Sequence, residues 1–145
     1  MTRSAETLRV GIDLVPVAEV AASVEYFGER YVTRLFTPHE IAACRTAEGP
    51  ARTRGTYVVE SLAARFAAKE AVVKVLRPIE MQPDWRSIEI HRMTGGWCEI
   101  RLSGQAAELA ADAGIAELTV SLSHETAVAG AVVVGRCIPR ERGEE

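Results

Sequence analysis

Hydrophobic and polar positions along this chain follow two periods, one typical of strands and one typical of helices. Branched apolar residues at 8–15 (LRVGIDLV) predict a strand that is buried on both faces or nearly so. Apolar residues at helical spacing follow over 17–28. Thr37, Pro38 and Glu40 then form a capping-box pattern with a proline in the first turn, so another helix is predicted to begin there.

The second half of the chain predicts two further helices and two strand pairs. The longest helix is expected over 60–76, where good helix formers run without glycine or proline. A shorter helix over 104–114 is closed by a glycine at its end. Alternating segments joined by short turns predict two antiparallel hairpins, which pair 87–93 with 98–103 and 117–123 with 127–135.

The order of these elements predicts the fold class. Because helices precede and separate antiparallel strand pairs, we expect an α+β fold with helices packed on one mainly antiparallel sheet. The 145 residues suffice for a single domain and not for two of ordinary size. We expect the core of this domain over about 8–135, with loose ends at 1–7 and 139–145.

Composition points to a soluble cytoplasmic protein. Hydrophobic residues make up 48% and charged residues 26% of the chain, and no apolar run approaches the roughly 20 residues that cross a bilayer. The N-terminal segment lacks the apolar core of a secretion signal. Cys44, Cys98 and Cys137 are far apart and have no histidine or cysteine at metal-ligand spacing, which favours reduced, mostly buried thiols.

The net charge of -3 argues against a nucleic-acid partner, but the charge is unevenly distributed. Between Arg45 and Arg77 there are seven basic residues and three acidic ones. Such a cluster is commonly a solvated helix face with a basic loop before it. The alternative is a pocket for a small polyanion.

The segment RFAAKEAVVKVL, residues 65–76, contains the most informative charged pair. Glu70 and Lys74 are four residues apart on a predicted helix stripe that includes Phe66 and is flanked by Val73. On an exposed face they would form an ion pair that stabilises the helix by roughly a few tenths of a kcal/mol. A carboxylate held against an apolar surface instead needs a cation, a metal ion or a hydrogen bond. Spacing alone leaves both interpretations open.

Asp13 and His124 raise the same kind of question. Asp13 lies inside an apolar strand, where it either bonds a nearby backbone amide or needs a cation, and Gly11 leaves its side of the strand open to close approach. With Glu70 and Lys74 it would form a Mg²⁺ site that water and substrate phosphates complete. His124, at a turn in SLSHE, is either an exposed polar residue or a donor to a phosphate.

Four segments, VGIDLVPVAEV, FTPHE, RFAAKEAVVKVL and SLSHE, occur in this order, and through them the sequence resembles the 4′-phosphopantetheinyl transferases. It is similar in particular to the short holo-acyl-carrier-protein synthase group, from about Val10 to Val134. The resemblance implies the α+β fold of that family and a homotrimer with an active site in each subunit interface. It also implies transfer of 4′-phosphopantetheine from coenzyme A to a serine of an apo acyl or peptidyl carrier protein, with Mg²⁺ as cofactor and 3′,5′-ADP as released product.

By position, the resemblance assigns roles to the charged residues above. Asp13 and Glu70 match the Mg²⁺ ligands, and Lys74 matches the lysine that contacts the reacting phosphate. Glu70, or a water molecule that it orients, is then the candidate base. Val15 stands where longer family members have a third acid, which fits the short group.

Further basic residues are assigned to the coenzyme. Arg65 and His124 match positions that approach the phosphates of coenzyme A in the family. Arg52 and Arg54 are expected to reach its 3′-phosphate from their loop. A coenzyme that carries three phosphates would account for the basic segment of the chain.

Two departures from the family pattern concern the partner and the coenzyme. Glu19 stands in the first helix where the short group usually has a basic residue that docks the acidic carrier, so a polyketide, peptide or other specialised carrier is an alternative to a fatty-acid carrier. Trp97, in TGGWC, is expected to reshape the coenzyme pocket. Two other functions stay open: a non-catalytic family member that binds a carrier or partner domain, and a Mg²⁺-dependent phosphohydrolase.

Overall fold

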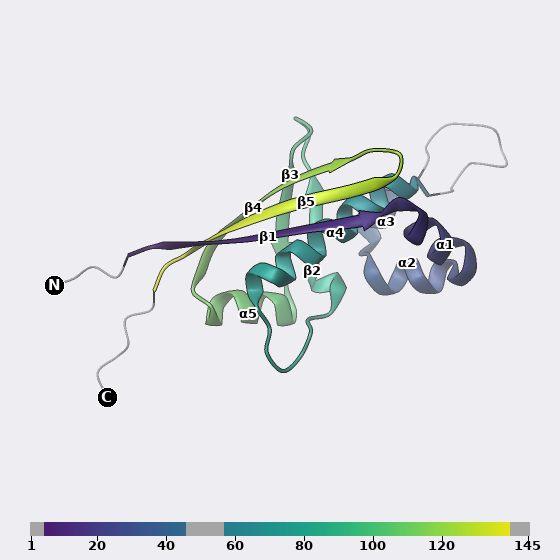
Figure 1. The fold of residues 1–145 in the computed structure, drawn as a ribbon. Coiled ribbons are helices and arrows are strands. Elements are labelled where there is room, and N and C mark those ends of the chain that lie inside the picture. Colours follow the sequence, from purple (N-terminus) through teal and green to yellow (C-terminus); the bar gives the residue numbers. More distant parts are fainter. Residues whose placement is uncertain (1–4, 46–56, 140–145) are drawn as a thin grey trace.

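The structure is a computed structural model that describes residues 5–45 and 57–139. Helices and strands follow one another along the chain as shown in Figure 1. Their bounds are β1 (Thr7–Pro16), α1 (Val17–Phe27), α2 (Glu29–Leu35), α3 (Pro38–Ala43), α4 (Val59–Leu76), the 3-10 helix η1 (Trp85–Ser87), β2 (Ile88–Arg92), β3 (Cys98–Leu102), α5 (Gly104–Asp112), β4 (Ile115–His124) and β5 (Val128–Cys137).

The α+β class and most predicted elements are confirmed. Helices α1, α4 and α5 lie where helices were predicted over 17–28, 60–76 and 104–114. At the start of α3 the predicted capping box is formed, because the Thr37 side chain accepts from the Glu40 amide and the Glu40 side chain accepts from the Thr37 amide. Helix α2 was not predicted. It begins directly after Gly28, whose φ of 58° breaks the helical pattern, and it is too short to show a period of its own.

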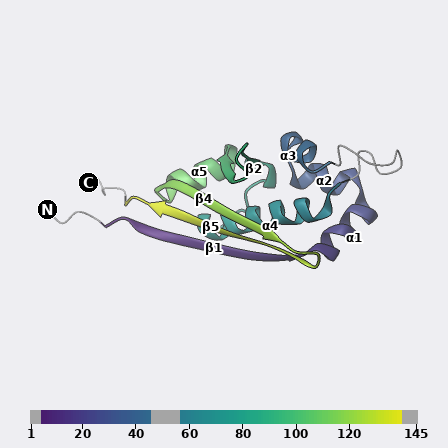
Figure 2. The same ribbon diagram turned by 90° about the horizontal axis from the view of Figure 1, so that it is seen from above.

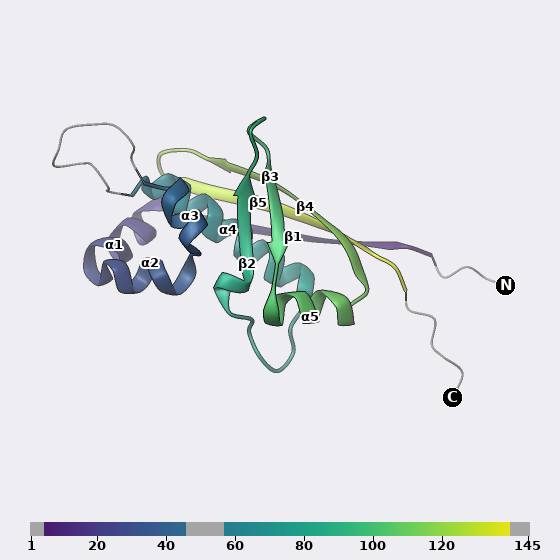
Figure 3. The same cartoon turned by 180° about the vertical axis from the view of Figure 1, so that it is seen from behind.

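All strand pairs are antiparallel, but the strands form two sheets and not the single sheet that was predicted. One sheet has the order β1-β5-β4, and the other contains only β2 and β3. The β2–β3 hairpin runs across the direction of the long strands (Figure 3). Alternation of apolar residues fixes each hairpin locally, but it does not say which hairpins share a sheet.

Helix α4 lies between two layers (Figure 2). The three-stranded sheet covers one side of it, and α5 and the β2–β3 hairpin lie on the other side. Its alanines allow this close packing, since Ala63, Ala67, Ala68 and Ala71 are completely buried. None of the helices within the described residues is long and apolar enough to cross a membrane.

The exposure of α4 differs from the prediction. The stripe that contains Phe66, Glu70 and Lys74 was predicted to be the apolar face, but it is the least buried side of the helix. Phe66 and Glu70 are half-buried and Lys74 is exposed, whereas Arg65 and Lys69 are buried. Because neighbours surround the helix on nearly all sides, the positions of its larger apolar residues did not identify the buried face.

Strand β1 was predicted to be buried on both faces, and this prediction was wrong. Its even-numbered residues are exposed: Leu8, Val10, Ile12 and Leu14 have 57–72% of their surface accessible. On its other face, Gly11 and Val15 are buried, and Arg9 and Asp13 are half-buried. A sheet that is covered by a helix on one side only leaves the apolar residues of the other side open.

At Gly11 the strand approaches α4 more closely than any other residue type would allow. A Cβ atom at this position would overlap the carbonyl oxygen of Ala71 and would lie 3.1 Å from the Cβ of Lys74. Side chains two residues apart on a strand share a face, so the next inward residue after Gly11 is Asp13. The missing side chain at Gly11 therefore brings Asp13 close to α4.

A buried ion pair fixes the opposite side of α4. Lys69 Nζ lies 2.7 Å from Glu40 Oε1, and both side chains are completely buried. Glu40 Oε2 also accepts from the amide of Ile90, at 3.1 Å, and Lys69 Nζ donates to the carbonyl of Trp85, at 2.9 Å. Burial lowers the pKa of Lys69, and the charge of Glu40 opposes this shift. Helices α3 and α4 and strand β2 are thereby joined through one carboxylate and one ammonium group.

Lys69→Met is expected to lower the free energy of unfolding by about 3–5 kcal/mol, because it leaves the Glu40 carboxylate buried without its cation. Urea denaturation followed by circular dichroism measures this loss. As a control, Arg86→Ala removes the exposed ion pair with Asp84 (3.7 Å) and should cost less than about 1 kcal/mol. Equal stability of the Lys69→Met and wild-type proteins would contradict the structural role of the buried pair.

Candidate active site

Asp13, Glu70 and Lys74 come together where β1 crosses α4. Lys74 Nζ lies 3.2 Å from Asp13 Oδ1 and donates to the carbonyl of Ile12 at 2.7 Å. The lysine therefore pairs with the strand aspartate, and not with the glutamate one turn earlier on its own helix. The Asp13 side chain is largely buried, with 14% of its surface exposed, whereas that of Lys74 is 54% exposed.

Glu70 faces Asp13 from the helix. Burial, followed by a hydrogen bond to Asp13 and the charge of Asp13, raises the pKa of Glu70 to about 7, and Lys74 opposes this shift. Burial and the charge of Glu70 raise the pKa of Tyr31, so this side chain of α2 also lies near the glutamate. Two carboxyl groups so close together favour a shared proton or a bound cation.

The donors in this half of the site suit a hard cation. Asp13 Oδ2 is buried and has no hydrogen-bond partner, so one carboxylate oxygen keeps its lone pairs for a ligand. Asp13 and Glu70 offer carboxylate oxygens, the ligands that Mg²⁺ prefers. The described residues contain no group of three or more His, Cys, Asp or Glu placed to hold a metal, so water and substrate would have to complete the coordination.

Arg65 and His124 lie in a separate cavity of about 340 Å³. Its wall also includes Arg92 and Trp97 from the β2–β3 hairpin. Arg65 is 8% exposed, and its Nε is a second buried polar atom that has no hydrogen-bond partner. Across the described residues, the only two such side-chain atoms are Asp13 Oδ2 and Arg65 Nε, one in each half of the predicted site.

Helix α4 separates these two halves. Arg65 and Glu70 are five residues apart, so they point about 140° away from each other around the helix. Asp13 pairs with Ala131 in β5, and Ala131 pairs with Leu122 in β4, so the outer strands are two strand spacings, about 10 Å, apart. The structure brings Asp13, Glu70 and Lys74 together and Arg65 and His124 together, but it does not join the two groups within one chain.

Several residues of this region differ from what the sequence predicted. Arg54, predicted to bind the coenzyme, lies outside the described residues, as does Arg52. His124 ends strand β4 and does not lie in the turn after it. Tyr31 and Arg92 were not singled out from the sequence, because their neighbours contain no motif. Strand alternation places Arg92 on the same face as the buried Ile88 and Ile90, so it did not predict that Arg92 is exposed.

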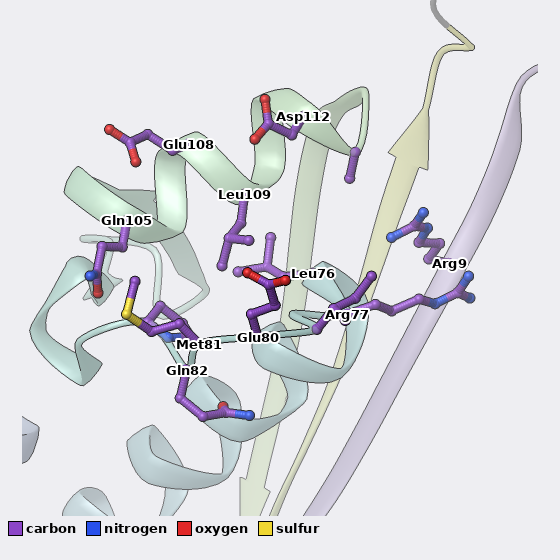
Figure 4. A pocket seen from close by; sticks show the side chains of 13 residues that line it. Arg9, Leu76, Arg77, Glu80, Met81, Gln82, Gln105, Glu108, Leu109 and Asp112 are labelled. Atoms are coloured by element: carbon purple, nitrogen blue, oxygen red, sulfur yellow. The ribbon is translucent and has the colours of Figure 1, made fainter.

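A larger cavity of about 710 Å³ lies elsewhere, between α5 and the segment after α4. In Figure 4, Leu76 and Glu80 lie below Leu109 of α5, and the side chains of Arg9 and Arg77 lie to one side. None of the predicted site residues lines it. The size of a cavity therefore does not identify the site that the charged residues indicate.

Comparison with known proteins decides the family. Residues 9–131 match the family model described as 4′-phosphopantetheinyl transferase superfamily. The chain belongs to this superfamily. The transferase is 43% identical over 130 residues to the holo-[acyl-carrier-protein] synthase of Desulforudis audaxviator, and this match covers 88% of this chain and 93% of the relative. It is 40% identical over 127 residues to the synthase of Moorella thermoacetica, with coverage of 88% and 92%.

A solved structure supports the same relationship. The holo-[acyl-carrier-protein] synthase of Helicobacter pylori, in complex with coenzyme A, superposes on this transferase with a TM-score of 0.72 at 30% identity. The match covers 88% of this chain and 99% of that one. The resemblance drawn from four sequence segments and the fold that it implied are thereby confirmed, while the roles of individual residues stay predictions.

The raised pKa of Glu70 predicts how the stability of the metal-free transferase depends on pH. A carboxyl group whose pKa rises from 4.5 to about 7 on folding favours the folded state when protonated, so this stabilisation is lost as pH rises between these values. The wild type should therefore lose stability relative to Glu70→Gln over this interval. Urea denaturation of both proteins in EDTA, at several pH values, measures the difference. Parallel stability profiles would contradict a raised pKa.

Proposed function

We propose that this protein transfers 4′-phosphopantetheine from coenzyme A to a serine of an apo acyl or peptidyl carrier protein and releases 3′,5′-ADP. The observation that carries the proposal is the convergence of Asp13 and Glu70 with Lys74, in a member of this superfamily. Relatives that carry the name holo-[acyl-carrier-protein] synthase, and one solved with coenzyme A, support it.

The side chains of the first half of the site suit this reaction. The serine oxygen bonds to phosphorus as the P–O bond to the departing 3′,5′-ADP breaks. Lys74 Nζ, which is largely exposed, is available to offset charge on the phosphate under attack. Glu70, directly or through a water molecule that it orients, is the group that would accept the serine proton.

Asp13 and Glu70 are the residues that would hold Mg²⁺, and the unpartnered Asp13 Oδ2 supports this assignment. When bound there, Mg²⁺ supplies positive charge next to the pyrophosphate. Arg65 and His124 are assigned to the phosphates of the coenzyme, because they share a cavity and because Arg65 Nε has no partner of its own. Arg54 is assigned to the 3′-phosphate of the coenzyme, and it lies outside the described residues.

We infer a homotrimer from the exposed face of the long sheet. Leu8, Val10, Ile12 and Leu14 of β1, with Val132 of β5, leave a continuous apolar surface that a monomer would expose to water. The two halves of the site lie toward opposite edges of this sheet, β1 and β4. In a closed ring with head-to-tail contacts, edge β1 of one subunit lies next to edge β4 of its neighbour. Such a ring would join the two halves of the site across each interface.

The helix next to the candidate site bears on which type of carrier protein docks. Helix α1 follows directly on β1, and its exposed Glu19 and Glu25 are not accompanied by any basic residue within the helix. An acidic docking surface favours a carrier that is less acidic than the usual fatty-acid carrier. A non-catalytic carrier-binding protein would show the same surface, but it would not require two half-sites with unpartnered polar atoms. The predicted cytoplasmic location stays a prediction.

Glu70→Gln is expected to abolish transfer while the fold stays intact, because the amide keeps the shape of the side chain and loses its charge. The assay incubates the protein with coenzyme A, Mg²⁺ and a panel of apo carriers of fatty-acid, polyketide and peptide type, and measures carrier mass. Wild type should add the phosphopantetheine mass to at least one carrier, and the control Glu108→Gln on α5 should behave as wild type.

Two outcomes would contradict the proposed function. Unchanged transfer by Glu70→Gln would make the glutamate structural. No mass gain on any carrier would favour the non-catalytic alternative. A reaction without carrier serves as the blank, since release of 3′,5′-ADP there would favour the phosphohydrolase.

A further inference from the structure

Arg77 has a backbone conformation that arginine rarely adopts. It follows the last residue of α4 in the left-handed region, with φ 53° and ψ 56°. Among the described residues it is the only one other than glycine that has a positive φ. Glycine is the usual residue at such a helix end, because a Cβ atom makes this conformation costly. A strained backbone at an arginine points to a use of its side chain.

Arg9 reaches the same end of α4 from strand β1. Its Nη1 donates to the carbonyl of Val75 at 3.0 Å, so the guanidinium group caps the last turn of the helix. In Figure 4 the side chains of Arg9 and Arg77 lie on the same side of the 710 Å³ cavity, which both residues line. Neither forms an ion pair with a carboxylate in the part of the chain that the structure describes. Two guanidinium groups that share a cavity without a counter-charge favour a bound anion.

The other walls of this cavity are mainly aliphatic. Leu76 and Pro83 are buried and Leu109 is half-buried, whereas Ile79 and Met81 leave 97% and 66% of their surface open to water. No aromatic side chain among the described residues lines the cavity, so a nucleobase would find no ring on which to stack. An aliphatic chain suits these walls, and the cavity volume lies within the range of small-molecule sites.

Three carboxylates restrict the charge of the ligand. Glu80, Glu108 and Asp112 also line the cavity, and all three are exposed. Their repulsion disfavours an anion with several charges, such as a phosphate monoester. A single carboxylate carries one charge and can still accept hydrogen bonds from two guanidinium groups. The cavity therefore suits a monoanion with an aliphatic chain.

We propose that this cavity is a second ligand site of the protein, and that it binds an aliphatic carboxylate. Arg9 and Arg77 bind the carboxylate group, and the chain lies against Leu76, Leu109 and Met81. The inference goes beyond the proposed function and does not rest on it. The ligand would join β1, which carries Asp13, to the end of α4, which carries Lys74, without touching either residue.

The chemical class of the ligand is tested by calorimetric titration with hexanoate, octanoate and decanoate, below the concentrations at which they form micelles. One molecule should bind per chain, and the dissociation constant should fall by about 4-fold for each added CH₂ group, because that group leaves water. Decyltrimethylammonium has the same chain length with a positive charge and should not bind. Inorganic phosphate, which has no chain, should not bind either.

Substitutions at Arg77 test the head-group contact. Arg77→Gly should raise the dissociation constant for decanoate by about 3- to 10-fold, since a partly exposed charged hydrogen bond is lost. The Tm of the free variant should not fall, because glycine adopts this backbone conformation without strain. Arg77→Asn, which also tolerates the left-handed region, should weaken binding in the same way. As a matched control, Arg101→Gln removes an exposed arginine of β3 and should bind decanoate as wild type does.

Methyl groups of methionine report where the ligand binds. Met81 lines the cavity and Met93, which follows β2, does not. In NMR spectra of protein labelled at the methionine methyl groups, decanoate should shift the Met81 signal, assigned through Met81→Leu, and leave the Met93 signal in place.

Several results would overturn the second site. These are the absence of decanoate binding, equal shifts at Met81 and Met93, equally tight binding of decyltrimethylammonium, and unchanged affinity in folded Arg77→Gly and Arg77→Asn proteins. Glu70→Gln should bind decanoate as wild type does. A protein that binds decanoate in this way but transfers nothing to any carrier would support the second site and overturn the transferase activity alone.

Discussion

The position of α4 depends on a contact in which β1 has no side chain to keep the helix away. At Gly11 the strand lies against the carbonyl of Ala71, and on the far side of the helix the buried Lys69 is held by Glu40. Together these contacts fix both the depth and the rotation of α4. Glu70 follows Lys69 directly, so a helix rotation that buries the lysine turns the glutamate toward Asp13.

The same rotation explains why the predicted site residues fall into two groups. A helix fixed with Glu70 toward β1 must point Arg65 toward the other side, where β4 and the β2–β3 hairpin form a cavity. Each half then retains a buried polar atom without a partner. Such atoms cost stability unless a ligand or a partner satisfies them.

Local sequence patterns predicted much of this fold, whereas the exposure of several residues depends on which elements pack against one another. The capping box at Thr37 and the hairpin around Gly95 are set by residues a few positions apart, and both were predicted. The exposure of Leu14 and of the Glu70 stripe depends on which elements cover β1 and α4, which no local period contains. Lys74 pairs with Asp13, which lies 61 positions away in the sequence. Spacing along the chain could propose only the neighbouring Glu70 as the partner of Lys74, and only a family resemblance could bring Asp13 to the same site.

Subunit complementation tests the divided site most directly. Asp13→Asn damages one half-site and Arg65→Ala the other, so homo-oligomers of either variant should transfer little phosphopantetheine. Oligomers that contain both subunits, purified through two different tags, should regain transfer, because one interface then unites an intact Asp13 with an intact Arg65 from the neighbouring subunit. Mixed oligomers that stay as inactive as their parents would contradict the account, and so would a monomer with full activity.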